Sequence, residues 1–189
     1  MIEREKKLLL TQDEYDYLME HLGYESPLIQ KPITTQINYY FDTDDLSMNR
    51  QNTTCRIRFK DGKYKATMKK HSTDSEQSTE TEIAIYNGLD SNAFIDMGLK
   101  LHGKLITKRC VVLKDANYKV VLDKNEYLGH TDYELEIEYA LGHEKDAKSI
   151  YRYIVETLQR NCPLITYSTA IISSKSARFF EVYATKERR

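Results

Sequence analysis

The stretch YELEIEY, residues 133–139, places a glutamate at every second position: Glu134, Glu136 and Glu138. In an extended chain, successive side chains point to opposite faces, so the three carboxylates share one face and the apolar residues between them share the other. Carboxylates two positions apart lie only roughly 7 Å from each other and repel one another unless positive charge lies between them. This stretch therefore predicts a β-strand whose charged face requires a positive partner.

Composition restricts the setting of that strand. The chain has 189 residues, with 28 Lys plus Arg against 29 Asp plus Glu, so its net charge of −1 gives no basic field for nucleic acid. No apolar run is long enough for a membrane span, and the first residues are too charged for a signal peptide. Three distant cysteines indicate reduced thiols, and therefore a cytoplasmic protein. We expect a single domain over 1–189, with its core at about 1–180, a C-terminal tail at 181–189 and fraying of the last residues, TKERR at 185–189.

The same alternation recurs along the chain. It predicts strands, each with one charged or polar face, at 2–10, 34–43, 54–60, 63–70, 78–86, 105–113, 118–129 and 133–139. The turn signal KDGK at 60–63 joins two of these stretches into a hairpin. Seven or eight strands, most of them paired with a sequence neighbour, indicate an antiparallel meander or barrel.

Helical patterns interrupt the strands. Residues 11–23 begin with Thr11 and a glutamate three positions later, which is a capping box, and Gly23 is a plausible stop. Residues 143–161 carry an apolar stripe at helical spacing. Shorter helices are predicted at 90–99, with room for two turns, and within 169–184.

The charges are segregated by strand. A solvated sheet face usually mixes signs, and this remains the simplest interpretation of any one strand. Here, however, one strand carries three glutamates while another carries Arg56, Arg58 and Lys60. Like charges side by side cost stability, so the segregation favours a ligand site.

Closing the sheet with its charged faces inward would gather two sets of side chains in one lumen. The acidic set is Glu3, Glu5, Glu80, Glu82, Asp123, Glu134, Glu136 and Glu138; the basic set is Lys7, Arg56, Arg58, Lys65, Lys69 and Arg109. Carboxylate oxygens attract hard cations such as Mg²⁺ or Mn²⁺, and a basic wall beside them suits a chain of phosphates. The positive partner of the glutamates is then a metal ion that holds phosphate oxygens.

The N-terminal EREKK, with its Glu-x-Glu-x-Lys pattern, resembles the signature of the CYTH, or triphosphate tunnel metalloenzyme, family. QINYYFDT, RIRFKDGKYKATMKK, TETEI, TKR, LDKNEYLG, YELEIEY and SKSARF are similar to the family's successive elements, in the same order, from residue 3 to about 179. The resemblance implies an α+β, mainly β fold: an eight-stranded antiparallel closed tunnel with a charged lumen and helices packed outside. It also implies metal-dependent hydrolysis of inorganic, thiamine or nucleoside triphosphate.

The resemblance also implies roles for individual residues. Glu3, Glu136 and Glu138 would hold the metal, Glu5 would place a second metal or the attacking water, and Lys7 would face phosphate charge. The phosphate path would be formed by Arg56, Arg58, Lys65, Lys69 and Arg109, with Lys175 and Arg178 added from the C-terminal SKSARF element. Glu134 and Asp123 complete the predicted metal set, and Glu80 and Glu82 support it; Asp123, Glu80 and Glu82 have the alternative role of orienting a basic neighbour.

Two other functions stay open. An adenylate cyclase of the same fold would make cyclic AMP from ATP, although no residues for an adenine pocket can be named. A non-enzymatic module would only bind polyphosphate. We expect a small-molecule triphosphate as partner, without nucleic acid or membrane, in a monomer or homodimer. The histidines are assigned to the surface or loops, and Cys55 and Cys110 to apolar packing.

Overall fold

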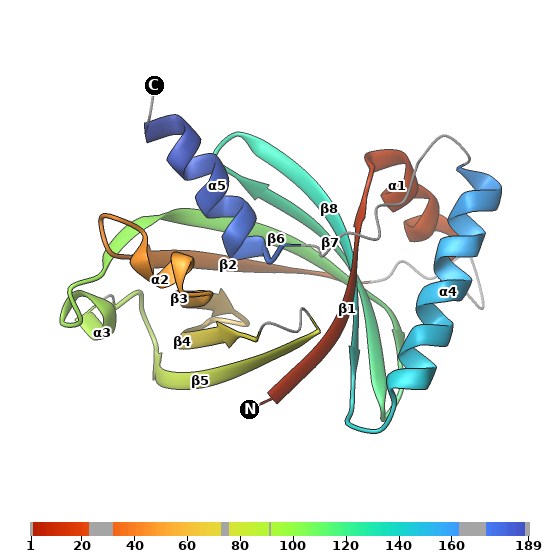
Figure 1. Cartoon of the computed structure of the whole chain (residues 1–189), viewed down its shortest axis with the longest axis horizontal. Helices are drawn as coiled ribbons and strands as arrows, with labels where there is room; N and C mark the ends of the chain where they lie inside the picture. The colour runs from red at the N-terminus through yellow and green to blue at the C-terminus, as the bar shows by residue number, and fades with distance from the viewer. Residues whose placement is uncertain (1, 23–31, 73–75, 91, 163–172, 188–189) are drawn as a thin grey trace.

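The computed structural model describes residues 2–22, 32–72, 76–90, 92–162 and 173–187. Its strands form a closed antiparallel barrel in the order β1-β5-β4-β3-β2-β6-β7-β8 (Figure 1). The strands are β1 (Ile2–Leu10), β2 (Ile33–Asp42), β3 (Thr53–Lys60), β4 (Lys63–His71), β5 (Gln77–Tyr86), β6 (Lys100–Lys114), β7 (Tyr118–Tyr127) and β8 (His130–Tyr139). The eight-stranded barrel is confirmed.

The hairpin of β3 and β4 shows how local sequence sets the register. Asp61 and Gly62 have φ of 50° and 77°, and this pair of left-handed residues matches the twist of the two strands that it joins. Arg58 then lies opposite Lys65, and Thr54 opposite Lys69. The cationic faces of the two strands are therefore turned to the same side, into the barrel.

Strand β6 is longer than predicted and begins five residues before the expected start at 105. Gly103 reads as a strand breaker in sequence, yet it lies where the pairing of β2 and β6 shifts register. Its φ is +150°, and an added Cβ would come 3.0 Å from the Cζ of Phe179. Glycine is thus needed here because the aromatic ring packs directly on the strand.

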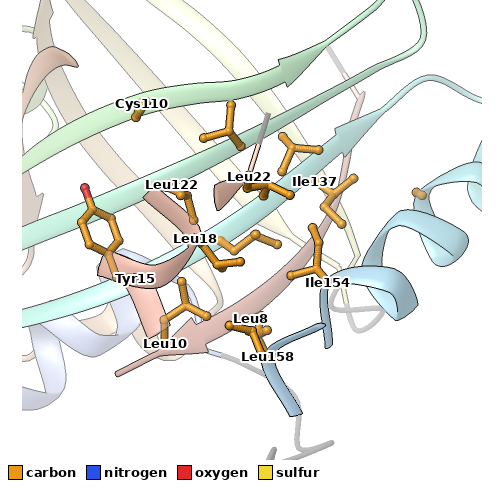
Figure 2. Packing of buried hydrophobic residues seen from close by; sticks show 14 of the residues in the cluster. Leu8, Leu10, Tyr15, Leu18, Leu22, Cys110, Leu122, Ile137, Ile154 and Leu158 are labelled. Atoms are coloured by element: carbon orange, nitrogen blue, oxygen red, sulfur yellow. The ribbon is translucent and has the colours of Figure 1, made fainter. Parts of the chain in front are cut away.

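Helices α1 (Gln12–His21) and α4 (Glu144–Asn161) cover the outside of the barrel. Leu18 of α1 and Ile154 and Leu158 of α4 pack with Leu8 and Ile137 from the strands (Figure 2). The capping box is confirmed, since Thr11 Oγ1 accepts a hydrogen bond from the Glu14 amide at 3.3 Å. The predicted stop at Gly23 lies outside the described residues. This apolar jacket leaves the opposite strand faces to form the lumen.

A second apolar cluster covers the outside of β3–β5. Phe94, from the single-turn α3 (Asn92–Ile95), packs on Phe41, Ile57 and Cys55. The segment 90–99 thus forms one turn rather than two, and the short α2 (Ser47–Arg50) was not predicted. Cys55 and Cys110 are fully buried in apolar clusters, as expected.

Helix α5 (Lys175–Glu187) does not join the outer jacket. Phe179 and Phe180 are buried against Tyr40, Leu105 and Tyr127. Tyr40 and Leu105 lie on the inward strand faces, so the helix fills one end of the lumen and crosses the barrel in Figure 1. Helix α5 continues to Glu187, so residues 185–187, which were expected to fray, are helical. Within the described ranges, no helix is long and apolar enough to span a membrane.

Candidate active site

The lumen contains a cavity of about 380 Å³ between the strands and the beginning of α5. Half of the residues that line it are charged. The predicted site residues on its surface are Glu3, Glu5, Lys7, Arg56, Arg58, Lys69, Arg109, Glu136, Glu138 and Lys175. Ten side chains from six elements thus converge on one space.

The seam between β1 and β8 brings carboxylates face to face. Glu5 lies directly opposite Glu138, and Lys7 directly opposite Glu136. Lys7 Nζ is 2.9 Å from Glu5 Oε1, and Lys69 Nζ is 3.3 Å from the same oxygen. Burial and the charge of Glu136 raise the pKa of Glu5, but Lys7 and Lys69 outweigh them and leave that pKa below its ordinary value. Glu5 is therefore an anion held in place by two lysines.

Arg109 and Lys175 neutralise the acidic face of β7 and β8. Arg109 donates to Asp123 at 2.6 Å and forms ion pairs with Glu136 and Glu138. Lys175 Nζ lies 2.7 Å from Glu136 Oε1 and 2.9 Å from Asp123 Oδ2. Burial opposes the charge of Glu136, yet Lys175 and Arg109 hold its pKa well below the ordinary value. This side of the cavity carries its own counter-ions.

The opposite side, on β2–β4, is differently balanced. Arg56 pairs with Glu80, whereas the Nε of Arg58 donates to the neutral Asn38 Oδ1 at 2.8 Å. Among the described residues, no carboxylate comes within 4.0 Å of the Arg58 guanidinium. Burial, followed by the charges of Arg56 and Arg109, lowers the pKa of Arg58 to about 10. Arg58 is thus a half-buried cation on the cavity surface whose described hydrogen-bond partner is a neutral amide.

Several predicted ligand residues lie away from the cavity surface. Lys65 and Glu82 pair with each other at 2.6 Å and are 45% and 47% exposed. Asp123 and Glu134 are fully buried behind Lys175. Alternation predicts which face of a strand a side chain lies on, but not how far along the lumen it lies. These four side chains therefore do not line the cavity.

Arg178 and Glu80 also form internal pairs rather than lining the cavity. Arg178 bonds Asp132 at 2.9 Å and also pairs with Glu134, while Glu80 orients Arg56. Arg178 was predicted to bind phosphate, but these carboxylates occupy its guanidinium. Glu80 takes the supporting position that the sequence suggested for it.

His71 is the main residue of the site that the sequence interpretation missed. It was assigned to the surface or a loop, but it lines the cavity on β4. Burial, then Lys69 and Lys7, lower its pKa to about 4, so its imidazole is neutral at ordinary pH. Position 71 continues the inward series 65, 67, 69, and extending that strand by one residue would have found it.

The carboxylates on the cavity surface fit a hard cation in their chemistry. Glu3, Glu5, Glu136 and Glu138 are all-oxygen donors on the cavity surface, and the pair Glu5–Glu138 sets like charges opposite each other. In the described part of the chain, no three acidic, histidine or cysteine side chains already converge as metal ligands. A cation would therefore bind by exchange with the lysine and arginine partners of these glutamates.

Comparison with known proteins decides the family. The CYTH domain model matches residues 1–160. The chain belongs to the CYTH family. YjbK of Bacillus subtilis (strain 168), provisionally named a triphosphatase, is 32% identical over 162 residues, covering 76% of this chain and 80% of that protein.

Two solved CYTH-like folds superpose on the barrel. A Bacillus halodurans protein provisionally named an adenylate cyclase is 25% identical, with a TM-score of 0.66 and coverage of 94% of this chain and 97% of that one. HpAC1 from Hippeastrum is 18% identical, with a TM-score of 0.63 and coverage of 96% and 95%. The second likeness concerns the fold alone.

Proposed function

We propose that this CYTH protein hydrolyses a triphosphate with the help of Mg²⁺ or Mn²⁺. The observation that carries the proposal is the pairing of two unlike walls across one cavity. Glutamates of β1 and β8 form one wall, and Arg56, Arg58 and Lys69 form the other. A polyanion that carries a divalent cation complements both walls at once, whereas a simple anion or a bare cation complements only one.

The metal would be held by the carboxylates that reach the cavity: Glu3, Glu5, Glu136 and Glu138. A bound Mg²⁺ or Mn²⁺ would neutralise phosphate charge and so lower the cost of charge that develops during transfer. The buried Asp123 and Glu134 have a different part, because they hold Lys175 beside that site.

Phosphoryl transfer requires alignment and charge stabilisation more than covalent catalysis. Arg58 and Arg56 would bind the phosphate oxygens, and Lys69 would bridge them to Glu5. Glu5 Oε1 would accept a hydrogen bond from the attacking water and orient it. Lys7, at 2.9 Å from that oxygen, keeps Glu5 ionised for this task.

The names of the relatives favour two reactions. YjbK supports triphosphate hydrolysis, while the Bacillus halodurans protein raises the alternative of cyclic AMP formation from ATP. We favour hydrolysis because the described lining supplies cations for phosphate, namely Arg56, Arg58 and Lys69, whereas we can name no residues for an adenine pocket. Product analysis separates the two, since hydrolysis yields phosphate and cyclisation yields cyclic AMP with pyrophosphate.

The direct test offers inorganic triphosphate, thiamine triphosphate, ATP and GTP, each with Mg²⁺ and with Mn²⁺, and measures phosphate release. Glu5→Gln keeps the size of the side chain but removes its charge, and we expect it to lower kcat about 10²–10³-fold. Triphosphate affinity, measured by calorimetry, should hold or rise because less negative charge opposes the substrate. Glu82→Gln is the matched control, because Glu82 lies in an exposed pair outside the cavity.

Three results would contradict the proposal. Cyclic AMP as the product would assign the cyclase. Tight triphosphate binding without turnover under every condition would assign a binding module. Parent-level hydrolysis by Glu5→Gln would remove Glu5 from the catalytic role.

A further inference from the structure

Helix α5 is tied to both walls of the cavity at its first turn. On one side, Lys175 reaches the carboxylates of β7 and β8, with Nζ within 2.7–3.2 Å of Glu136, Asp123 and Glu134. On the other side, the next residue, Ser176, is buried against β3. Its Oγ lies 2.6 Å from Thr54 Oγ1. The ion pairs of Lys175 belong to the site already described, whereas the hydroxyl contact has no part in it so far.

The hydroxyl contact continues to His71. Thr54 Oγ1 is 3.3 Å from His71 Nε2, and Ser176 Oγ is also 2.9 Å from Ser174 Oγ. Ser174 Oγ accepts a hydrogen bond from the Ala177 amide at 3.2 Å. An unbroken chain of polar contacts thus runs from the first turn of α5, through two buried hydroxyls, to an imidazole on β4.

One direction satisfies every member of this run of contacts. The Ala177 N–H donates to Ser174 Oγ, and the hydroxyls can then donate in turn from Ser174 to Ser176, from Ser176 to Thr54 and from Thr54 to His71 Nε2. In that arrangement Nε2 is the acceptor, as in the neutral imidazole with its proton on Nδ1. Burial and the nearby Lys69, Lys7 and Arg56 disfavour a charged ring and outweigh the opposing charge of Glu5.

We infer that His71 is a positioning residue: through Thr54 and Ser176 it holds the first turn of α5, and with it Lys175, over the cavity. Lys175 is flanked by Ser174 and Ser176, the two serines of this series of hydrogen bonds. Breaking the series therefore releases the backbone on both sides of Lys175. His71 itself need not touch substrate for this role. The inference deepens the proposed function, because Lys175 lies beside Glu136 and lines the same cavity.

The test measures the first turn of α5 directly, by hydrogen–deuterium exchange of amides 175–180 in the full chain without substrate. His71→Met removes the acceptor while keeping an apolar volume, and Thr54→Val removes the hydroxyl at nearly constant shape. Each should speed exchange at this turn about fivefold, the typical effect of losing one neutral hydrogen bond. The double variant should exchange no faster than either single variant, because both changes break the same chain.

Two variants keep the test specific. His71→Gln places an amide oxygen near the position of Nε2 and should restore slow exchange. Thr53→Val makes the same change one residue away and should leave the turn unchanged, because among the described residues its hydroxyl bonds only the Gln51 carbonyl, at 3.4 Å. In binding experiments with inorganic triphosphate, Kd should rise for His71→Met and Thr54→Val and stay at the parent value for His71→Gln.

The inference is overturned if both single variants leave exchange at 175–180 unchanged, if His71→Gln exchanges as fast as His71→Met, or if the two changes add. These readouts need no turnover. A parent protein that neither binds nor hydrolyses triphosphate would refute the proposed function, while the exchange rates would still decide the role of His71.

Discussion

The two walls of the cavity differ in how their charged side chains are paired. On the β1–β8 side, each glutamate of the cavity meets a lysine or arginine, and Arg109 and Lys175 are each shared by three carboxylates. On the β2–β4 side, Arg58 has only the neutral amide of Asn38 as its hydrogen-bond partner in the described structure. On the second wall Arg56 and Lys69 also have carboxylate partners, so the contrast between the walls rests on Arg58.

The difference separates stability from function. Where charges are paired internally, removing one partner leaves the other charge in a poorly solvated place and destabilises the protein. A charge held without an opposite partner weakens the empty protein but is available to a ligand. Substitutions on the two walls should therefore have opposite effects on the free energy of unfolding.

The largest effect is expected at Arg109. Arg109→Met keeps much of the length of the side chain but leaves Asp123, Glu136 and Glu138 short of a counter-ion, and it should lower the free energy of unfolding by about 3–5 kcal/mol. Urea denaturation measures this loss. Lys108→Met, at the neighbouring position, removes only the exposed contact with Glu126 and should cost no more than about 1 kcal/mol. Equal losses for the two variants would abolish the contrast between the walls.

Arg58 should show the reverse. Its folded-state pKa is lowered to about 10, so the unfolded chain binds more protons between pH 10 and the ordinary value of 12.5. The charged guanidinium therefore destabilises the folded protein at neutral pH. Arg58→Met should raise the free energy of unfolding of the empty protein by about 1 kcal/mol, allowing for the lost bond to Asn38. The same variant should lower triphosphate turnover about 10²–10³-fold.

Ligand linkage provides the control for Arg58. Triphosphate with Mg²⁺ at 100 times its Kd should stabilise the parent by about 2.7 kcal/mol, and stabilise Arg58→Met by much less at the same concentration. Lys60→Met, on the same strand but exposed at its end, should change neither stability nor linkage. A destabilised Arg58→Met that still responds fully to triphosphate would show that the second wall is structural.

The sequence predicted the walls well because strand alternation fixes the face on which each side chain lies. It did not predict depth: Glu134 and Glu136 share a face and a strand, yet Glu136 lines the cavity and Glu134 is buried behind Lys175. Lys65 and Lys69 differ in the same way along β4. Depth depends on the stagger of the strands and on where α5 enters the lumen, and both are set by contacts between residues far apart in the chain.

The helices show the same difference between local signals, which the sequence reveals, and long-range contacts, which it does not. Helices α1 and α4 carry local signals, namely a capping box and an apolar stripe, and the sequence placed both correctly. The position of α5 depends on Phe179 packing against Gly103 and on ion pairs across the lumen, which no local pattern encodes. The pairing of Arg178 with Asp132 and Glu134 followed from that position and could not be read from the sequence.

The smallest effect, and the finest test of the contrast, is the dependence of stability on pH. His71 has a folded pKa of about 4 against an ordinary 6.5, so the unfolded chain takes up a proton in this range that the folded protein excludes. Stability should therefore fall as pH drops from 6.5 to 4. The carboxylate wall responds at lower pH. The pKa of Glu136 lies well below the ordinary 4.5, so the stability that Glu136 adds is lost only as pH falls below 4.5.

Changing His71 should separate the two ranges. His71→Gln cannot take up the proton, so the fall in the free energy of unfolding between pH 6.5 and 4.5 should be smaller than in the parent by about 1 kcal/mol, less than the full 1.36 kcal/mol per pH unit because the ring is only partly buried. The further loss below pH 4.5 should remain. Urea denaturation across pH measures both, with His130→Gln, an exposed imidazole in the β7–β8 hairpin, as control. If His71→Gln and the parent lose stability in parallel down to pH 4.5, protonation of His71 does not cause the loss in that range. The two walls would then not respond to acid separately.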